Sequence, residues 1–338
     1  MANGSSESAP KWKPSRLLRL EEDGISAIAE RDGFLAVADT HGSVTLFNEE
    51  LQKLKWTQNF SAGRIMSVSF HVEYDNFAKQ GPDTILGDFL VSFEGPGCGV
   101  VSFTSGELET VVNTKGSPWT IHDVHPTKNI VILGNIHGLL VQYNYLSNER
   151  ISENEMSFED EMTCVRFSVC GTLVAVGTRR GNLWLLRAES LEPARSIPFS
   201  YSKGSIRAVE WSECGEFLAT LDTDRCVSVF RQNKLLAAWE LLGRHRGHAR
   251  HILQLMFGRS PDTGDRILLS LGKDMKLNEY DLETSTISEG LMLSARNEVE
   301  QRCQPTCAMW HPPTLGQEAF IVIANKVLRK LYHKHCKK

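Results

Sequence analysis

Short apolar segments of alternating character run along the whole chain and are separated by small polar residues. Examples are FLAVAD (34–39), SVTLF (43–47), NIVILG (129–134), TLVAVG (172–177) and CVSVF (226–230). They are rich in β-branched and aromatic residues, and Gly, Asp, Asn and Ser stand between them. This pattern is typical of β-strands joined by tight turns, and stretches of helical period are hard to find. The chain is therefore predicted to be all-β.

The tight turns recur at regular intervals. One position in each turn marks the repeats, at His41, Gly97, His137, Arg180, Asp224, Asp274 and Lys326. The intervals are 56, 40, 43, 44, 50 and 52 residues, and in six of the seven repeats an aromatic residue follows six positions later. Periods of this length are typical of propellers, in which each repeat forms one small sheet.

A further strand precedes each paired turn, as in MSVSFH, TCVRFSVCG, RAVEWSECG and TCAMWHPP. The complete unit resembles the WD40 repeat, which supplies four strands per blade of a β-propeller. Seven units imply a single seven-bladed propeller. The last unit lacks an outer strand, and RLLRL (16–20) precedes the first. We therefore expect the N-terminal strand to complete the last blade and close the ring.

This reading divides the chain into three parts. We expect a disordered tail over 1–14, the propeller over 15–333 and a basic tail over 334–338. The longer intervals are expected to be insertions between the first two strands of a blade, at 72–88, about 259–266 and 311–318. All three would then lie on one rim of the ring.

Composition narrows the class of protein. The chain has 338 residues, 41% of them hydrophobic, with 37 basic and 41 acidic residues and a net charge of −4. That balance argues against binding to bulk nucleic acid, which requires a basic face. Eight cysteines are too few for a disulfide scaffold, and no secretory signal or apolar run of membrane-spanning length occurs. We expect a soluble cytoplasmic protein with no membrane, nucleic-acid or small-molecule partner.

Four residues of the sixth repeat match a structural tetrad of the WD40 family. In that family a His after Gly, a Ser in the second strand, an Asp in the next turn and a Trp in the third strand form a network. The matching residues are His248, Ser270, Asp274 and Tyr280, with Tyr280 where Trp is usual. The resemblance implies that these side chains hold the sheet together.

Ser, His and Asp are also the residues of a hydrolase triad. A hydrolase needs an exposed nucleophile with oxyanion donors. Ser270 instead lies in the apolar segment LLSLG, and the chain has no G-x-S-x-G elbow. The structural network is therefore favoured. The first, third and fourth repeats lack it, because their Ser position holds Val37, Leu133 and Val176.

A propeller enzyme would need convergent carboxylates or histidines at the central channel. The candidates by position are Asp39, Asp123 and Asp222, although each suits a strand end or turn equally well. We therefore expect no catalytic residue and no cofactor.

Zinc is a second alternative, because CQPTCAMWH (303–311) and HKHC (333–336) contain tetrahedral zinc ligands. However, Cys307, Met309 and His311 alternate along one strand, and the C-x₃-C spacing differs from the usual C-x₂-C knuckle. We therefore expect no bound metal.

Charged loops are the candidate partner-binding residues. The basic ones are Arg179, Arg180, Arg244, Arg246 and Arg250, all expected on one rim. The acidic ones, Glu159, Asp160 and Glu161, belong to NEMSFEDE (154–161). These residues form either solvated loops or separate positive and negative zones for docking. Separate zones suit protein partners, and the 243–251 loop lacks the aromatic residues that single-stranded nucleic acid would require.

Six segments resemble, more narrowly, a family of WD-repeat proteins of motile cilia. They are GISAIAERDGFLAVADTHGSVTLFN, HPTKNIVILGNIHGLLVQYNY, CGTLVAVGTRRGNLWLL, FSYSKGSIRAVEWSECGEFLAT, RILLSLGKDMKLNEYDLE and QPTCAMWHPP. The resemblance covers about residues 15–332 and matches the second propeller of the longer family chain. An earlier propeller and a later EF-hand-like region of that family are absent from this sequence, so a calcium-linked role is not implied.

This resemblance implies a non-enzymatic scaffold of the axonemal cytoskeleton near the base of a radial spoke. Its implied partners are subunits of the radial spoke and of the calmodulin- and spoke-associated complex. A general WD40 adaptor of another cytoplasmic complex, such as a ubiquitin ligase or a trafficking complex, stays open. Only the six family-like segments separate the two functions.

Overall fold

The structure is a computed structural model of the chain. It describes residues 12–19, 24–31, 34–48, 51–59, 64–70, 89–93, 97–101, 108–110, 119–145, 147, 149–233, 235, 238–260, 263–299, 304–311, 319–325 and 327–333. The predicted insertion at 72–88 and most of that at 311–318 lie outside these residues. The part of the chain that the structure describes contains no helix of the length and apolarity that crossing a membrane requires.

Seven antiparallel sheets form within the described residues, and we number them in chain order. Sheet 1 is β2–β5 (Ile25–Arg31, Phe34–Asp39, Ser43–Asn48, Lys53–Asn59) and sheet 2 is β6–β9 (Ile65–Phe70, Phe89–Phe93, Gly97–Val101, Leu108–Thr110). Sheet 3 is β10–β13 (Trp119–Val124, Ile130–Asn135, Leu139–Asn144, Glu149–Ser157) and sheet 4 is β14–β16 (Met162–Phe167, Leu173–Thr178, Leu183–Arg187).

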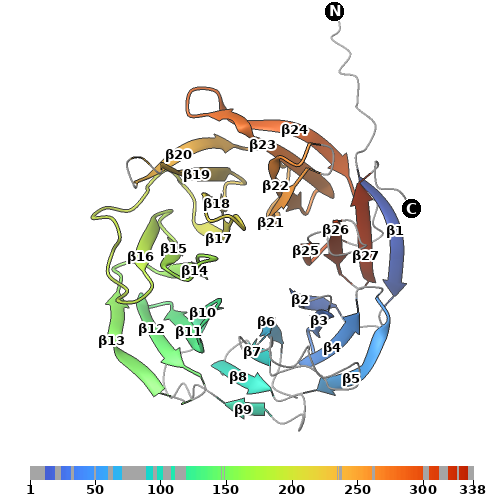
Figure 1. The fold of residues 1–338 in the computed structure, drawn as a ribbon, viewed down its shortest axis with the longest axis horizontal. Coiled ribbons are helices and arrows are strands. Elements are labelled where there is room, and N and C mark those ends of the chain that lie inside the picture. The colour runs from blue at the N-terminus through green and yellow to red at the C-terminus, as the bar shows by residue number, and fades with distance from the viewer. Residues whose placement is uncertain are drawn as a thin grey trace, which may run out of the picture.

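The remaining sheets complete the set. Sheet 5 is β17–β20 (Ile206–Trp211, Phe217–Asp222, Val227–Asn233, Ala238–His245) and sheet 6 is β21–β24 (Ile252–Arg259, Arg266–Gly272, Lys276–Thr286, Gly290–Glu298). Sheet 7 joins β25–β27 (Cys307–His311, Phe320–Ala324, Val327–His333) to β1 (Trp12–Arg19). Figure 1 shows the sheets standing around a central opening, with the first strand of each nearest the axis. The prediction of an all-β propeller is confirmed.

Sheet 7 combines strands from distant parts of the chain. β1 pairs antiparallel with β27, with Trp12 opposite His333 and Arg19 opposite Val327. The ring of Trp12 is buried and meets Trp310 of β25 edge-on, with ring centroids 5.9 Å apart. The strand therefore begins three residues before the expected boundary at residue 15. Residues 1–11 and 334–338 lie outside the described part of the chain.

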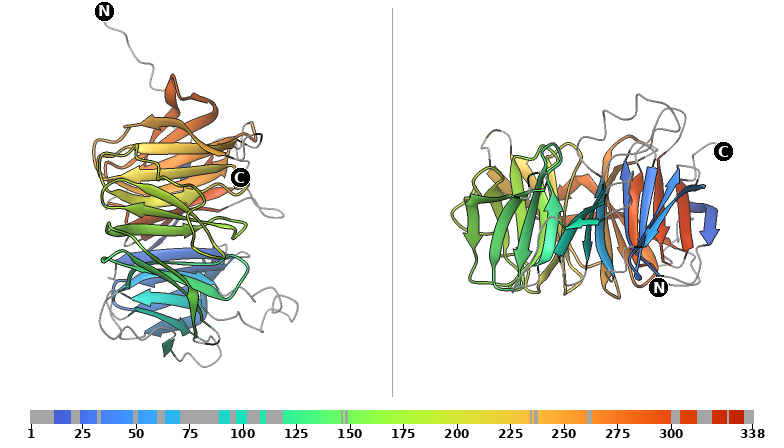
Figure 2. Two further views of the ribbon diagram at one scale, coloured as in Figure 1. Left: turned by 90° about the vertical axis from the view of Figure 1, so that its left-hand side faces the viewer. Right: turned by 90° about the horizontal axis from the view of Figure 1, so that it is seen from below.

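Two rims follow from the antiparallel order of the strands. Rim 1 carries the turns between the second and third strands of each sheet and the connections to the next sheet. Rim 2 carries the connections between first and second strands and the turns between third and fourth strands. Seen edge-on, the strands run across the thickness of the ring from one rim to the other (Figure 2).

Sheet 4 has an irregular outer edge. The segment after β16 contains Pro193 and Pro198, which lack a backbone N–H and cannot continue a regular ladder. Leu183 exchanges two backbone hydrogen bonds of 2.9 Å with Phe199, and an isolated bridge joins Leu186 to Pro193. This segment therefore covers the edge of β16 without forming a fourth strand.

Apolar side chains between neighbouring sheets form the core. One cluster joins sheets 3 and 4 through Ile132, Val165 and Val176, which are almost fully buried. β18 of sheet 5 is buried at all six positions. The inner strands are therefore held by sheet-to-sheet packing, which fixes the side chains that face the channel.

Candidate functional site

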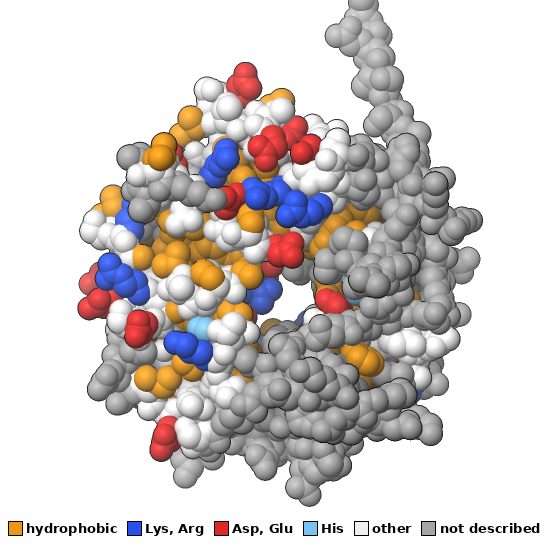
Figure 3. All heavy atoms as spheres, viewed as in Figure 1, with side chains coloured by type: hydrophobic (Ala, Val, Ile, Leu, Met, Phe, Trp, Pro, Cys, Tyr) orange, Lys and Arg blue, Asp and Glu red, His pale blue; other side chains and the backbone are white. Residues whose placement is uncertain are grey.

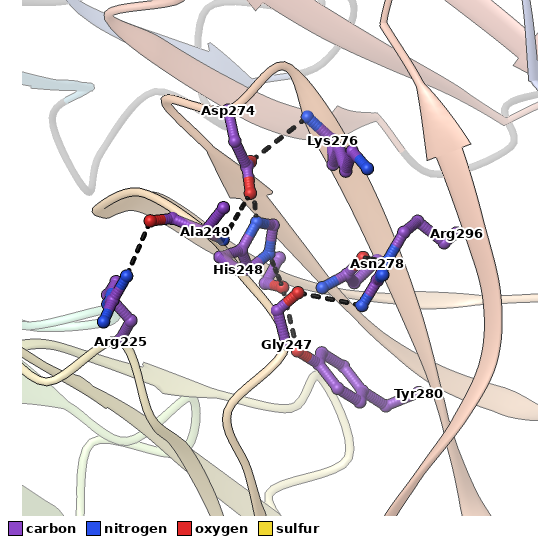
Figure 4. Close-up of polar contacts among 10 residues, drawn as sticks. Arg225, Gly247, His248, Ala249, Asp274, Lys276, Asn278, Tyr280 and Arg296 are labelled. Carbon is purple, nitrogen blue, oxygen red and sulfur yellow. Dashed lines mark hydrogen bonds and ion pairs between the residues drawn. The ribbon is translucent and has the colours of Figure 1, made fainter.

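The structure brings the four tetrad side chains together in sheet 6 (Figure 4). His248 Nδ1 lies 2.9 Å from Asp274 Oδ1, and His248 Nε2 lies 2.7 Å from Ser270 Oγ. The Tyr280 hydroxyl lies 3.2 Å from Ser270 Oγ. Ser270 and Tyr280 have no exposed surface, so no substrate reaches the serine hydroxyl in this structure.

The proton positions in this network follow from the pKa shifts. Burial lowers the pKa of His248, and the hydrogen bond with Asp274 only partly opposes it. Burial acts to raise the pKa of Asp274, but hydrogen bonds from His248 and from the Ala249 N–H outweigh it and lower the pKa. A neutral His248 then donates from Nδ1 to Asp274 and accepts from Ser270, whose oxygen accepts from Tyr280.

Two arginines tie the same loop to its surroundings (Figure 4). Arg296 donates to the carbonyl of Gly247 at 2.9 Å and to Asn278 Oδ1 at 3.1 Å. Arg225 of sheet 5 donates to the carbonyl of Ala249 at 2.6 Å. The loop before β21 is therefore fixed both within sheet 6 and to the neighbouring sheet.

The central channel contains a cavity lined by described residues. It has a volume of about 550 Å³ and is lined by the inner strands of all seven sheets. Acidic and basic side chains border its opening on the face in Figure 3. Arg166 of β14 lies 3.2 Å from Asp123 of β10 and 3.3 Å from Glu210 of β17. One guanidinium therefore bridges three consecutive sheets.

Backbone contacts extend this cluster. The Phe167 N–H donates to Asp123 Oδ2 at 2.6 Å, and the indole N–H of Trp211 donates to the Arg166 carbonyl at 3.3 Å. Burial raises the pKa of Asp123 and of Glu210 against the opposing effect of Arg166. Burial, followed by the charge of Arg166, lowers the pKa of the neighbouring His122 to about 4.

Only one of the three predicted channel carboxylates lies in the channel. Asp123 lines it, whereas Asp39 Oδ1 accepts the N–H groups of His41 and Ser43, both at 2.8 Å. Asp222 Oδ1 accepts the N–H of Cys226 at 2.9 Å. These two carboxylates close turns on rim 1.

We predict that Arg166→Met lowers the free energy of unfolding by about 1–2 kcal/mol. The substitution leaves Asp123 and Glu210 without their counter-ion, although solvent reduces the loss because the Arg166 side chain is 45% exposed. Urea unfolding of the two proteins measures the difference. Adding Asp123→Asn and Glu210→Gln should restore part of it, and a triple variant less stable than Arg166→Met would contradict the explanation.

His125 joins sheets 3 and 4 on rim 2. Its Nδ1 accepts the N–H groups of Thr127 at 3.1 Å and Lys128 at 3.0 Å, and its Nε2 lies 3.1 Å from the Gly171 carbonyl. The ring is buried and packs edge-on against Phe167. Since Nδ1 is an acceptor, the imidazole is neutral, and burial lowers its pKa.

His125 is expected to make stability fall as the pH is lowered. Above a pH of about 6.5 both the folded and unfolded states hold it neutral. As the pH falls from there towards the lower folded pKa, the unfolded state binds the proton first and the stabilisation is lost. His125→Gln should therefore reduce the fall in the thermal midpoint between pH 7.5 and 5.0. The other titrating groups are the same in both proteins, so they do not contribute to the difference between the two falls. An equal fall of the thermal midpoint in both proteins would exclude His125 as a cause.

The predicted charged residues divide into paired and free groups. Arg179 lies 2.6 Å from Glu161, and the Arg180 N–H donates to Asp160 Oδ2 at 3.1 Å. The expectation of separate positive and negative zones is wrong for these four residues, because rim 1 places the connection before β14 beside the turn after β15. Glu159 is exposed next to them.

The arginines of the 243–251 loop differ from one another. Arg244 belongs to β20 of sheet 5, where it donates to Ser228 Oγ at 3.3 Å and lies 3.9 Å from Asp222 Oδ2. Arg246 and Arg250 are exposed, and no hydrogen bond or carboxylate partner is recorded for them within the described residues.

Of the residues weighed as zinc ligands, the structure describes the side chains of Cys307 and His311. His311 Nε2 lies 3.4 Å from Glu30 Oε1, and its ring stacks on Phe320 with centroids 4.3 Å apart. No cluster of three or more His, Cys, Asp or Glu suited to a metal is found among the described residues. Cys303 and Cys336 lie outside them.

No protein-family model matches the chain, but similar proteins are found among solved structures and among curated sequences. The Cps50 (Swd1) β-propeller domain of Myceliophteria thermophila superposes with a TM-score of 0.70, 14% identity and coverage of 95% of this chain and 99% of that one. At that identity the similarity shows the fold alone.

Curated sequences extend the comparison. Cilia- and flagella-associated protein 251 of Pongo abelii is 27% identical over 97% of this chain, and that of Chlamydomonas reinhardtii is 27% identical over 93%. The chain spans only 30% and 40% of these two relatives. WD and tetratricopeptide repeats protein 1 of Homo sapiens is 30% identical over 32% of the chain. Along nearly its whole length, this chain is thus similar to a propeller-sized part of cilia- and flagella-associated protein 251.

Proposed function

We propose that this chain is a cilium-associated scaffold that binds other proteins and has no catalytic activity of its own. The observation that carries the proposal is the 27% identity to cilia- and flagella-associated protein 251 over 97% of a chain with a propeller fold. The name of those relatives supports a place in cilia or flagella. We further propose that the seven sheets act as seven blades of one closed ring, and that the chain serves in the axonemal cytoskeleton near the base of a radial spoke.

The mechanism is geometric. Rigid, packed sheets hold the loops of both rims in place, so little conformational entropy is lost when a partner binds. β1 pairs with β27 and completes sheet 7, so the first strand of the chain is tied into the last sheet of the ring. The proposed partners are subunits of the radial spoke and of the calmodulin- and spoke-associated complex.

Two features of the polar clusters support a non-enzymatic role. Ser270 is fully buried within its network, and Asp123 and Glu210 share the Arg166 guanidinium in the channel. A nucleophile must be reachable, and a general base needs room for a substrate proton. Both clusters are better suited to holding sheets together.

Affinity purification of the tagged chain from ciliated cells, with mass spectrometry and localisation, tests the proposal. We expect radial-spoke and calmodulin- and spoke-associated complex subunits, with signal along the axoneme. The tagged Cps50 propeller domain serves as the control for non-specific capture, since it shares the fold at 14% identity. Recovery of ubiquitin-ligase or vesicle-coat subunits with a diffuse signal would overturn the ciliary role and indicate a general adaptor.

A further inference from the structure

Five basic side chains lie on rim 1 over sheets 5 and 6, and we refer to them as the basic arc. They are Lys203, Arg225, Arg246, Arg250 and Lys273. Four of the five are exposed, and Arg225 is partly exposed. They belong to four separate segments, namely the connections before β17 and β21 and the turns after β18 and β22.

Three hydrogen bonds show that the four segments are neighbours. The Thr223 N–H donates to the carbonyl of Ser205 at 2.9 Å, which joins the connection before β17 to the turn after β18. Arg225 joins that turn to Ala249 in the connection before β21, at 2.6 Å. The Lys273 N–H then donates to the carbonyl of His251 at 2.8 Å. The basic arc is therefore one continuous surface, although its members are spread over seventy residues of sequence.

The charge of the basic arc is largely uncompensated. The parts of the four segments that carry the basic arc, at 203–205, 223–226, 246–251 and 273–275, contain two acidic residues, Asp224 and Asp274, and Asp274 is already bonded to His248 and to the Ala249 N–H. No carboxylate partner is recorded for Lys203 or Lys273 within the described residues, as for Arg246 and Arg250. Arg179 and Arg180, on the same rim over sheet 4, differ because Glu161 and Asp160 neutralise them.

We propose that the basic arc docks an extended, acidic protein segment, such as a run of glutamates on a partner. Arginine fork donors suit carboxylates, and a row of uncompensated charges attracts an acidic chain without requiring a pocket. This inference rests on the proposed function, because it names the class of partner that the scaffold holds.

A protein segment fits the surface better than nucleic acid does. Residues 203–205, 223–226, 246–251 and 273–275, which carry the basic arc, contain no Phe, Tyr or Trp on which bases stack, although Tyr201, two residues before Lys203, is 44% exposed. The adjacent Tyr201 stacks against Phe199, with ring centroids 6.5 Å apart. The chain as a whole has a net charge of −4, which disfavours a polyanion that must contact more than this one patch.

Fluorescence anisotropy with a labelled peptide of ten glutamates tests the inference, and a Gly-Ser peptide of equal length is the uncharged control. We expect Arg246→Ser with Arg250→Ser to weaken binding at least tenfold at low salt. The matched control, Arg179→Ser with Arg180→Ser, also removes two positive charges from rim 1 and should change binding less than twofold. The wild-type affinity should fall as salt rises from 50 to 200 mM.

Several results would overturn the inference. These are no binding of the glutamate peptide, equal loss in both double variants, or tighter binding of single-stranded DNA or of anionic vesicles than of the peptide. Thermal melting of both variants shows whether they remain folded, as expected for exposed side chains. If ciliary subunits are recovered from cells but the peptide does not bind, only this inference fails. If the peptide binds but no ciliary subunits are recovered, the proposed function fails instead.

Discussion

Replacing His248 with alanine should lower the free energy of unfolding by about 3 kcal/mol. The substitution removes a partner from Ser270, whose hydroxyl has no exposed surface, and from Asp274. Water does not reach Ser270 to replace the lost hydrogen bond, and a cavity remains where the ring was. Urea unfolding followed by tryptophan fluorescence measures the change.

The control for this variant is His251→Ala, which truncates an exposed histidine three residues further along the same connection. It should change stability by less than about 0.5 kcal/mol. Ser270→Ala should cost less than His248→Ala, because it leaves the bond between His248 and Asp274 in place. Equal stability of His248→Ala and His251→Ala would show that the network does not stabilise sheet 6.

Gly181→Ala is expected to cost about 4 kcal/mol, because two separate penalties add at one position. Gly181 ends the turn between β15 and β16 with a φ of 85°, a region that residues with a side chain rarely adopt. A Cβ there would lie 2.4 Å from the Ser202 carbonyl oxygen and 2.8 Å from that of Gly204. Both neighbours are backbone atoms of the connection before β17, which cannot rotate away.

A substitution at Gly215 measures the backbone penalty without the steric one. It has a φ of 70°, but a Cβ added to it meets nothing within 4 Å. Gly215→Ala should therefore cost only about 1 kcal/mol, from the backbone conformation alone. A thermal midpoint that falls equally in the two variants would mean that the contact between sheets 4 and 5 at Gly181 is not tight.

The tetrad could be predicted from the resemblance to the WD40 repeat, because its members keep that family's spacing within one repeat. Ser270 stands four residues before Asp274, and Tyr280 stands six after it. Antiparallel pairing of β22 with β23 turns that spacing into proximity, with Leu268 opposite Tyr280 and Ser270 opposite Asn278. The spacing along the sequence was therefore enough to predict which side chains meet, as it was enough to predict the strands.

The channel cluster was missed because its members lie in three different repeats. Asp123, Arg166 and Glu210 are 43 and 44 residues apart, which is one repeat each. The signal was present in IHDVH, TCVRF and RAVEW, where an acidic, a basic and an acidic residue occupy the same inner-strand position. Comparison of equivalent positions across repeats, rather than of charges within one loop, would have found it.

The pairing of the charged loops could not be predicted from the linear sequence. Arg179 and Glu161 are 18 residues apart, and nothing in the linear sequence separates a paired arginine from a free one such as Arg246. Pairing depends on which loop meets which turn across the rim. The rim geometry therefore had to be known before the basic arc could be distinguished from its neutralised neighbours.

The pairing of β1 with β27 also has a consequence for biosynthesis. At about 5–20 residues per second, the ribosome adds the roughly 300 residues between these strands in about 15–60 s. Throughout that time β1 has no partner, and the nascent chain carries an open strand edge that other growing chains can join. Trp12, which ends up covered against Trp310, is in contact with solvent or a chaperone until the seventh sheet emerges. Sheet 7 can therefore close only after β27 has emerged, and the yield of that step depends on how well this first strand is shielded in the meantime.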